Sequence, residues 1–142
     1  MESHAGLELE DLFSGVGQAC RATRGVAMAL ANFDLALNQL TMASVGNIEV
    51  RLLGPAERSG PAIRRGIVGW HDTKPSTTKH EWTPSSLLIM HSDGLRRDWN
   101  SDYYRDESRR PADQMAHKML EQLGKVDDDA TVIVAKAARS GE

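Results

Sequence analysis

Residues 87–95 read Leu-Leu-Ile-Met-His-Ser-Asp-Gly-Leu, and the interpretation of the whole chain starts from this stretch. The run from Leu87 to Met90 is apolar without alternation, which is typical of a short central strand covered on both faces. Asp93 and Gly94 follow directly where that strand should end. The stretch therefore predicts a buried strand whose carboxyl end leads into an acidic residue beside a glycine.

A second strand is expected at residues 131–136, directly after the acidic run 127–129. If the two strands pair antiparallel, the end of the first lies beside the start of the second, and Asp93 and Asp128 meet at one edge of the sheet. Clustered carboxylates without cysteine or convergent histidine ligands suit a hard cation such as Mg²⁺ or Mn²⁺. Gly94 would keep the backbone close to that ion, because it has no side chain in the way.

The other regular elements are expected from apolar periodicity and from turn residues. The helices expected are residues 7–22 and a second one that begins at Pro111 and ends at Gly124. The other strands expected are residues 40–45 and 48–53, with a turn or bulge at Gly46-Asn47. The composition of residues 26–33 also allows a helix, but if the next two segments are strands, this stretch is better taken as the first arm of a hairpin. Since the runs 86–91 and 131–136 lack alternation, they are expected to be the most buried strands.

Two stretches have the composition of loops. Residues 54–84 are rich in Gly, Pro, Ser, Thr and charge, and are expected to be mostly loop with one or two short strands, the apolar piece 66–70 among them. Residues 96–110 mix arginines with acids and predict a solvated flap or loop.

Composition limits the classes of function. The chain has 142 residues, 40% of them hydrophobic, which predicts one soluble globular domain or a large piece of one. Its net charge of -3 argues against nucleic acid as a partner. A single cysteine, Cys20, rules out an intrachain disulfide and fits a reducing compartment, so the expected location is the cytoplasm. No run of about 18 apolar residues is present, so no membrane partner is expected.

Short motifs stand at the ends of the two expected strands: Ser-Asp-Gly-Leu at residues 92–95 and Asp-Asp-x-Thr at residues 128–131. In order and spacing they resemble the strand-end and closing motifs of one enzyme family, the bacterial SpoIIE-like, type 2C (PPM) metal-dependent protein serine/threonine phosphatases. Further similar segments are Thr23-Arg24-Gly25, residues 43–48 (the family's Gly-Asn/His hairpin) and residues 66–69 (its Gly-x-x-Gly strand). The similarity runs from about residue 9 to 136.

The resemblance implies an α+β fold, a partial α-β-β-α sandwich of mostly antiparallel sheets flanked by helices. It also implies two metal ions, Mn²⁺ or Mg²⁺, which activate a water to attack a phosphoserine or phosphothreonine of a protein substrate. Carried over residue by residue, the metal site here comprises Asp93, Gly94 and Asp128. No side chain of this chain need act as a catalytic nucleophile, and the substrate class suggested is a phosphorylated STAS-type antagonist in stress or sporulation signalling.

The sequence also departs from the family. The family's Asp-Gly-x-Gly-His motif, which supplies further metal ligands, does not occur in these 142 residues. Residues 1–142 are therefore expected to be a single domain that corresponds to the C-terminal portion of a phosphatase domain, weak or inactive alone. An uncovered sheet edge would favour self-association or pairing with another segment. The alternative is a non-catalytic, phosphatase-like interaction module.

Simpler interpretations stay open for several residues. Asp93-Gly94 could be an ordinary turn, and Asp127 and Asp129 are expected to be solvated turn residues. His91 is expected to be a hydrogen-bonded core residue or to support a ligand, and no histidine is assigned to catalysis. The three tryptophans, Trp70, Trp82 and Trp99, could form a binding surface or the edges of the core.

Overall fold

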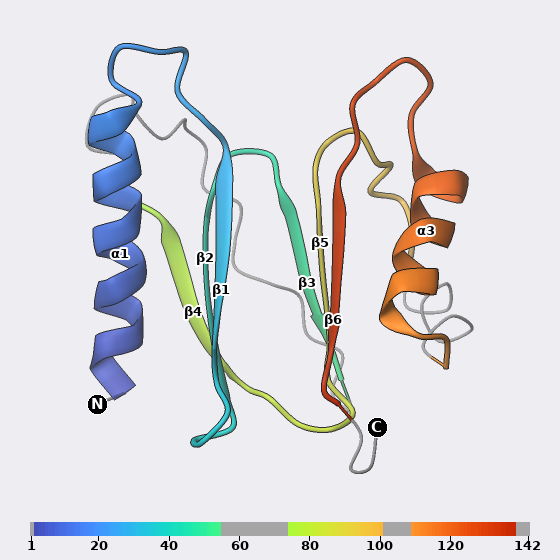
Figure 1. The fold of residues 1–142 in the computed structure, drawn as a ribbon, viewed down its shortest axis with the longest axis horizontal. Helices are drawn as coiled ribbons and strands as arrows, with labels where there is room; N and C mark the ends of the chain where they lie inside the picture. The colour runs from blue at the N-terminus through green and yellow to red at the C-terminus, as the bar shows by residue number, and fades with distance from the viewer. Residues whose placement is uncertain (1, 55–73, 101–108, 139–142) are drawn as a thin grey trace. The chain divides into compact units, whose positions relative to one another are not determined.

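The computed structural model describes residues 2–54, 74–100 and 109–138, with side chains from residue 8 onward. These residues form two compact units, one within residues 1–48 and 60–82 and the other within residues 49–59 and 83–142. Each unit combines one helix with a three-stranded antiparallel sheet (Figure 1). No helix in the described part of the chain is long and apolar enough to cross a membrane.

The first unit contains the helix α1 (Glu2–Ala19) and the strands β1 (Met28–Asp34), β2 (Gln39–Val45) and β4 (Ser76–Glu81). The strand β2 is central, and β1 and β4 pair with its two sides. The hairpin between β1 and β2 closes at the pair Asp34↔Gln39, and the Asp34 carboxylate accepts a hydrogen bond from the Leu37 amide at 3.1 Å.

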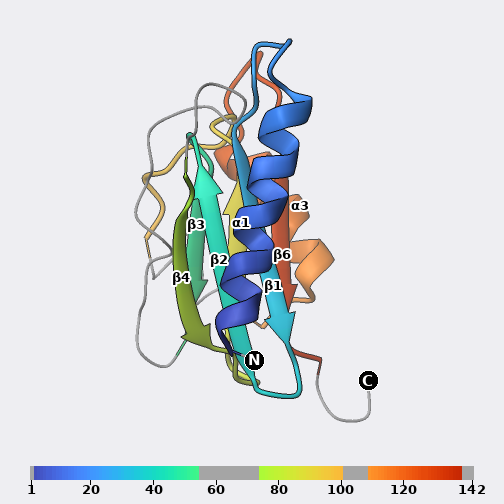
Figure 2. The ribbon, with the colours of Figure 1, turned by 90° about the vertical axis from the view of Figure 1, so that its left-hand side faces the viewer.

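The helix α1 packs against β1 and β2 in this unit (Figure 2). Leu9 and Phe13, one turn apart on the helix, are buried against Ala43 and Val45 of β2. Every residue of β2 from Leu40 to Val45 is buried, so this strand is covered on both faces. The burial of these apolar side chains is the main source of the unit's stability.

The second unit contains the strands β3 (Glu49–Leu53), β5 (Leu87–His91) and β6 (Val132–Lys136) and the helix α3 (Ala112–Leu123). The order of the strands in the sheet is β3-β5-β6, and both pairings are antiparallel. Three residues of α3, spaced by one turn, are fully or almost fully buried against the sheet: Met115, Met119 and Leu123. The core that they form also includes Leu53, Leu87, Ile89, Leu95 and Trp99.

Most expectations about single elements are confirmed. The class is α+β, and the described residues form two antiparallel sheets and two helices. The strand β5 is central and buried at all five positions, and β1 is the first arm of a hairpin. The helix α3 follows Pro111 and stops before Gly124, as expected. The helix α1 begins and ends a few residues earlier than expected, and β4 is a short strand within the region expected to be mostly loop. The apolar piece 66–70 and residues 101–108 of the expected flap lie outside the described residues.

One expectation is confirmed in part and another is wrong. The chain turns at Gly46-Asn47 as expected, but this turn does not close the hairpin that the family resemblance implied, because β3 pairs with β5 in a separate sheet from β2. Gly46 has a φ of 100°, a conformation that favours glycine, so this glycine does mark a turn although β2 and β3 do not pair with each other. The strand β6 is also not among the most buried, since it is the last strand of its sheet among the described residues: Val132 and Val134 pack on the core, whereas Ile133 is 54% exposed.

Candidate functional site

The carboxyl end of β5 lies beside the amino end of β6. The last pair of the ladder is His91↔Val132, and two further hydrogen bonds extend the pairing by one residue. The Ser92 amide donates to the Thr131 carbonyl at 3.0 Å, and the Thr131 amide donates to the Ser92 hydroxyl oxygen at 3.0 Å. The expected antiparallel pairing is therefore confirmed. The chain that continues from β5 into Asp93 starts beside the end of the chain that leads from Asp128 into β6.

Gly94 packs directly against the backbone that precedes β6. A Cβ atom at this position would lie 2.0 Å from the Asp129 carbonyl oxygen and 2.8 Å from the Ala130 Cα atom. The Gly94 carbonyl also accepts a hydrogen bond from the Lys125 amide at 2.8 Å. Because backbone atoms cannot move aside as a flexible side chain can, only glycine allows the segments after β5 and before β6 to approach this closely.

The two candidate metal ligands sit on these adjoining segments, and both Asp93 and Asp128 are exposed. Between α3 and β6 the chain turns at Asp127, whose φ of 61° is in the left-handed region that Asp tolerates better than most residues. Exposed carboxylates are the oxygen ligands that Mg²⁺ and Mn²⁺ prefer, so the donors present fit such an ion as part of its site. Among the residues that the structure describes, however, no three His, Cys, Asp or Glu side chains come together to hold a metal.

His91, the last residue of β5, is only 2% exposed and bridges two neighbours. Its Nδ1 donates to the Ser92 carbonyl at 2.8 Å, and its Nε2 accepts from the Trp99 indole N–H at 3.1 Å. These partners require the neutral imidazole with the proton on Nδ1. Burial lowers the pKa of His91 below its usual value, which favours the same neutral form. The expectation of a hydrogen-bonded core histidine is confirmed.

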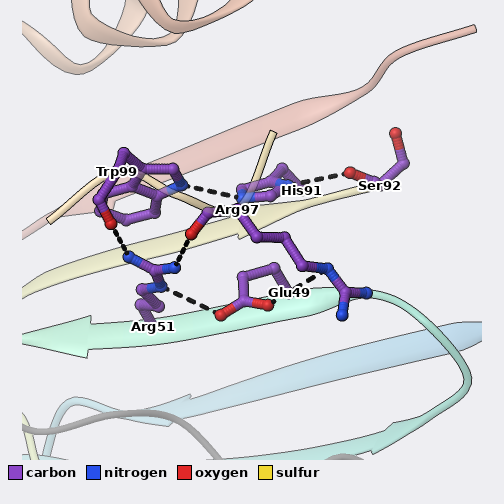
Figure 3. A network of polar contacts seen from close by, with 6 residues as sticks. All are labelled: Glu49, Arg51, His91, Ser92, Arg97 and Trp99. Carbon is purple, nitrogen blue, oxygen red and sulfur yellow. Dashed lines mark hydrogen bonds and ion pairs between the residues drawn. The ribbon is translucent and has the colours of Figure 1, made fainter. Parts of the chain in front are cut away.

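Sequence reasoning missed a polar network built on β3, which Figure 3 shows beside His91. The Arg51 guanidinium lies 3.8 Å from the centre of the Trp99 ring, and Glu49 forms ion pairs with Arg51 at 3.0 Å and with Arg97 at 3.5 Å. The only signal in the sequence is the alternation of β3, which places Glu49 and Arg51 on one strand face and Val50 on the other.

The tryptophans that the structure describes belong to the core. Trp82 and Trp99 are both buried, and Trp82 packs edge-on against Phe33 with ring centroids 4.8 Å apart. Trp99 contributes its ring to the core of the second unit and its indole N–H to His91. The alternative of a tryptophan binding surface is therefore wrong for these two residues, while Trp70 lies outside the described residues.

Comparison with known proteins assigns the family. Residues 7–138 match the family described as Stage II sporulation protein E (SpoIIE). The chain belongs to the SpoIIE family. No curated protein matches the chain significantly. This SpoIIE-family chain carries the Ser-Asp-Gly-Leu and Asp-Asp-x-Thr segments at the adjoining ends of β5 and β6, so the resemblance based on those motifs is confirmed.

Solved structures share the fold. A structure described as "The bacterial stressosome: a modular system that has been adapted to control secondary messenger signaling" is 29% identical, with a TM-score of 0.81 over 90% of this chain and 67% of that one. RsbX in complex with magnesium is 22% identical, with a TM-score of 0.72 over 94% of this chain and 66% of that one. The phosphatase domain of SpoIIE from Bacillus subtilis is 17% identical, with a TM-score of 0.63 over 96% of this chain and 74% of that one.

The SpoIIE-family chain thus spans about two thirds of the length of the first two of these structures. The second and third are similar at identities below 25% and support the α+β fold alone.

Proposed function

We propose that this chain provides the Asp93 and Asp128 side of the metal centre of a metal-dependent protein serine/threonine phosphatase. The observation that carries the proposal is the junction of β5 and β6, where the two hydrogen bonds between Ser92 and Thr131 join the segments that bear these acids. Family membership supports the reaction class, since the matched region contains both segments.

The residues at this edge have separate tasks in the proposed function. Asp93 and Asp128 bind the cation with charged oxygens and stay accessible to a protein substrate, because both are exposed. Gly94 holds the two segments together through its close contact with Asp129. Bound Mn²⁺ or Mg²⁺ would supply an activated water and offset the charge on the phosphoryl oxygens.

Two carboxylates are too few for a dinuclear site, because Mg²⁺ held by one or two acids takes its other ligands from water or substrate. We propose that the remaining acids come from an Asp-Gly-x-Gly-His segment, in the same polypeptide or in a partner. Such a segment can pair with the edge of β6, which has no neighbouring strand on that side within the described part of the chain. These 142 residues alone are then expected to hydrolyse phosphoesters marginally at most.

The substrate and location follow from the family as proposals. We propose a phosphorylated signalling protein of the STAS antagonist class as the substrate, and the cytoplasm as the location. A stressosome structure and a structure of the RsbU and RsbW domains of Rv1364c from Mycobacterium tuberculosis are among those with similar folds, which supports a role in regulatory signalling.

A second candidate function is a non-catalytic phosphatase-like module that binds a phosphoprotein. The observation that favours it is the missing third ligand: within the described ranges, no group of three metal-binding side chains forms. The two candidate functions predict different results when the missing metal ligands are added: the phosphatase should gain activity, and the binding module should not.

The test measures Mn²⁺-dependent hydrolysis of a phosphoserine peptide. Three samples are compared: the chain alone, the chain with an Asp-Gly-x-Gly-His segment of a SpoIIE-family relative added by fusion or in trans, and the same complemented form with Asp93→Asn. The proposal expects activity only in the second sample. An inactive complemented form that still binds the phosphopeptide would favour the interaction module. Robust turnover by the chain alone would contradict the claim that two carboxylates are too few for the metal centre.

A further inference from the structure

Arg51 holds a segment that lies more than 40 residues away in the chain. Its Nη1 donates to the Trp99 carbonyl at 2.6 Å and its Nη2 donates to the Arg97 carbonyl at 2.7 Å. Its Nε donates to the Glu49 carboxylate at 3.0 Å, and its guanidinium plane covers the Trp99 ring. One side chain on β3 therefore orders the start of the segment that follows Gly94.

The geometry of these contacts requires an arginine. The planar guanidinium presents donors in a fixed fork, so it can reach two main-chain carbonyls and a carboxylate at once while it stacks on an aromatic ring. A lysine ammonium has the charge without the fork. The Arg51 and Glu49 side chains are both largely buried, so loss of one would leave the other's charge poorly compensated.

The contacts continue from Arg51 to the candidate metal site. Trp99, which Arg51 holds, donates its indole N–H to His91, and His91 donates to the carbonyl of Ser92 (Figure 3). Ser92 directly precedes Asp93 and is also the residue that pairs with Thr131. The segment on either side of Asp93 is thus tied to the same arginine, on one side through residues 97–99 and on the other through His91.

We infer that Arg51 is a positioning residue of the proposed metal centre, and the inference rests on the proposed function. From β3 it fixes residues 97–99 directly and the Ser92 peptide through Trp99 and His91, and so sets the position of the Asp93 backbone. A carboxylate whose backbone is held in place loses less conformational freedom when it binds an ion, which raises the affinity for the metal.

The experiment follows Mn²⁺ binding by NMR on the ¹⁵N-labelled 142-residue chain. Paramagnetic broadening of the Gly94 and Ala130 amides reports an ion at this edge, and the Trp99 indole N–H resonance reports the contact with His91. The variants are Arg51→Met and Arg51→Lys, with Arg96→Met as the matched control. Arg96 is an exposed arginine whose guanidinium lies 3.8 Å from the Asp98 carboxylate and donates a hydrogen bond to the Gln122 carbonyl at 3.3 Å.

We expect the Mn²⁺ concentration at half-broadening to rise roughly ten- to hundredfold in Arg51→Met, which is the usual cost of losing a supporting contact behind a metal ligand. Arg51→Lys should shift it in the same direction and should also move the Trp99 indole resonance, because the ammonium cannot hold both carbonyls. Arg96→Met should change neither. If Arg51→Met does not fold, as judged by circular dichroism, Arg51→Lys carries the comparison.

The possible failures are distinguishable. A wild-type chain in which Mn²⁺ broadens neither Gly94 nor Ala130 would overturn the proposed function, and the inference about Arg51 with it. Broadening in the wild type with an unchanged half-point in the folded Arg51 variants would overturn the positioning role alone. In that case Arg51 would be a purely structural clamp, visible only as a loss of stability.

Discussion

Gly94 and Asp129 are in backbone contact: a Cβ atom on Gly94 would stand 2.0 Å from the Asp129 carbonyl oxygen. This contact joins the segments that bear Asp93 and Asp128, and the hydrogen bond between Gly94 and Lys125 at 2.8 Å reinforces it. The glycine is therefore needed for the approach of two chain segments, which is a stricter requirement than a turn would impose.

The first prediction concerns this contact. Gly94→Ala should lower the free energy of unfolding by about 1–3 kcal/mol, since the methyl group forces backbone atoms apart. Urea unfolding followed by circular dichroism measures the change. The control is Gly15→Ala in α1, where nothing lies within 4 Å of the added methyl group, and it should raise the free energy of unfolding by about 0.5–1 kcal/mol. Equal effects in the two variants would show that Gly94 is only a turn residue.

The second prediction concerns the candidate ligands. Asp93→Asn and Asp128→Asn should each abolish detectable Mn²⁺ binding, because a neutral amide replaces a charged oxygen ligand. We also expect the two carboxylates to lie within about 6 Å of each other at this sheet edge, a separation at which like charges perturb each other unless a cation bridges them. Electron paramagnetic resonance of Mn²⁺ measures the affinity, and a crystal structure with Mn²⁺ measures the separation.

Asp127→Asn is the matched control for the ligand variants. It removes the same charge one residue away, and Asn tolerates the left-handed φ of 61° at this position. Mn²⁺ affinity should be largely retained. If Asp127→Asn weakened binding as much as Asp128→Asn, the acidic run would act through its overall charge, and Asp128 would not be a specific ligand.

The third prediction concerns the pH dependence of stability. Burial lowers the pKa of His91 in the folded chain below the ordinary histidine value of about 6.5. As pH falls below about 6.5, the unfolded chain therefore takes up a proton that the folded chain excludes, and stability decreases until the folded pKa is reached. Above that range the contribution is fully present. Urea unfolding at several pH values, in the presence of a chelator, should show this loss.

Two variants test the assignment to His91. His91→Gln should remove the part of the pH dependence that occurs just below about pH 6.5. His117→Gln, an exposed histidine on α3, should leave that part unchanged. A wild-type slope that persists in His91→Gln would mean that another group causes it.

The fourth prediction concerns the edge strand β6. Its exposed apolar residue Ile133 and its position at the sheet edge favour association with another strand. Ile133→Lys should therefore shift the chain toward monomer in sedimentation velocity at high concentration. Leu120→Lys places the same charge at an exposed apolar site of α3 and should have a smaller effect. An equal effect would point to general hydrophobic association and away from strand pairing.

Much of this protein follows from local sequence. The apolar run from Leu87 to Met90 indicated a strand covered on both faces, and Pro111 and Gly124 marked the ends of α3, because burial and backbone preference act over a few residues. The adjoining ends of β5 and β6 were likewise predictable once antiparallel pairing was assumed, since the motifs at residues 92–95 and 128–131 flank the two strands.

Only the tertiary structure decided which distant segments meet. Arg51 and Trp99 are separated by 48 positions in the sequence. No local pattern specifies that an arginine on a strand donates a hydrogen bond to a main-chain carbonyl so far along the chain. The pairing of β3 with β5 and the edge position of β6 are of the same kind. An apolar run reports that a strand can be buried, but its neighbours depend on how the whole chain minimises exposed apolar surface and unpaired backbone groups.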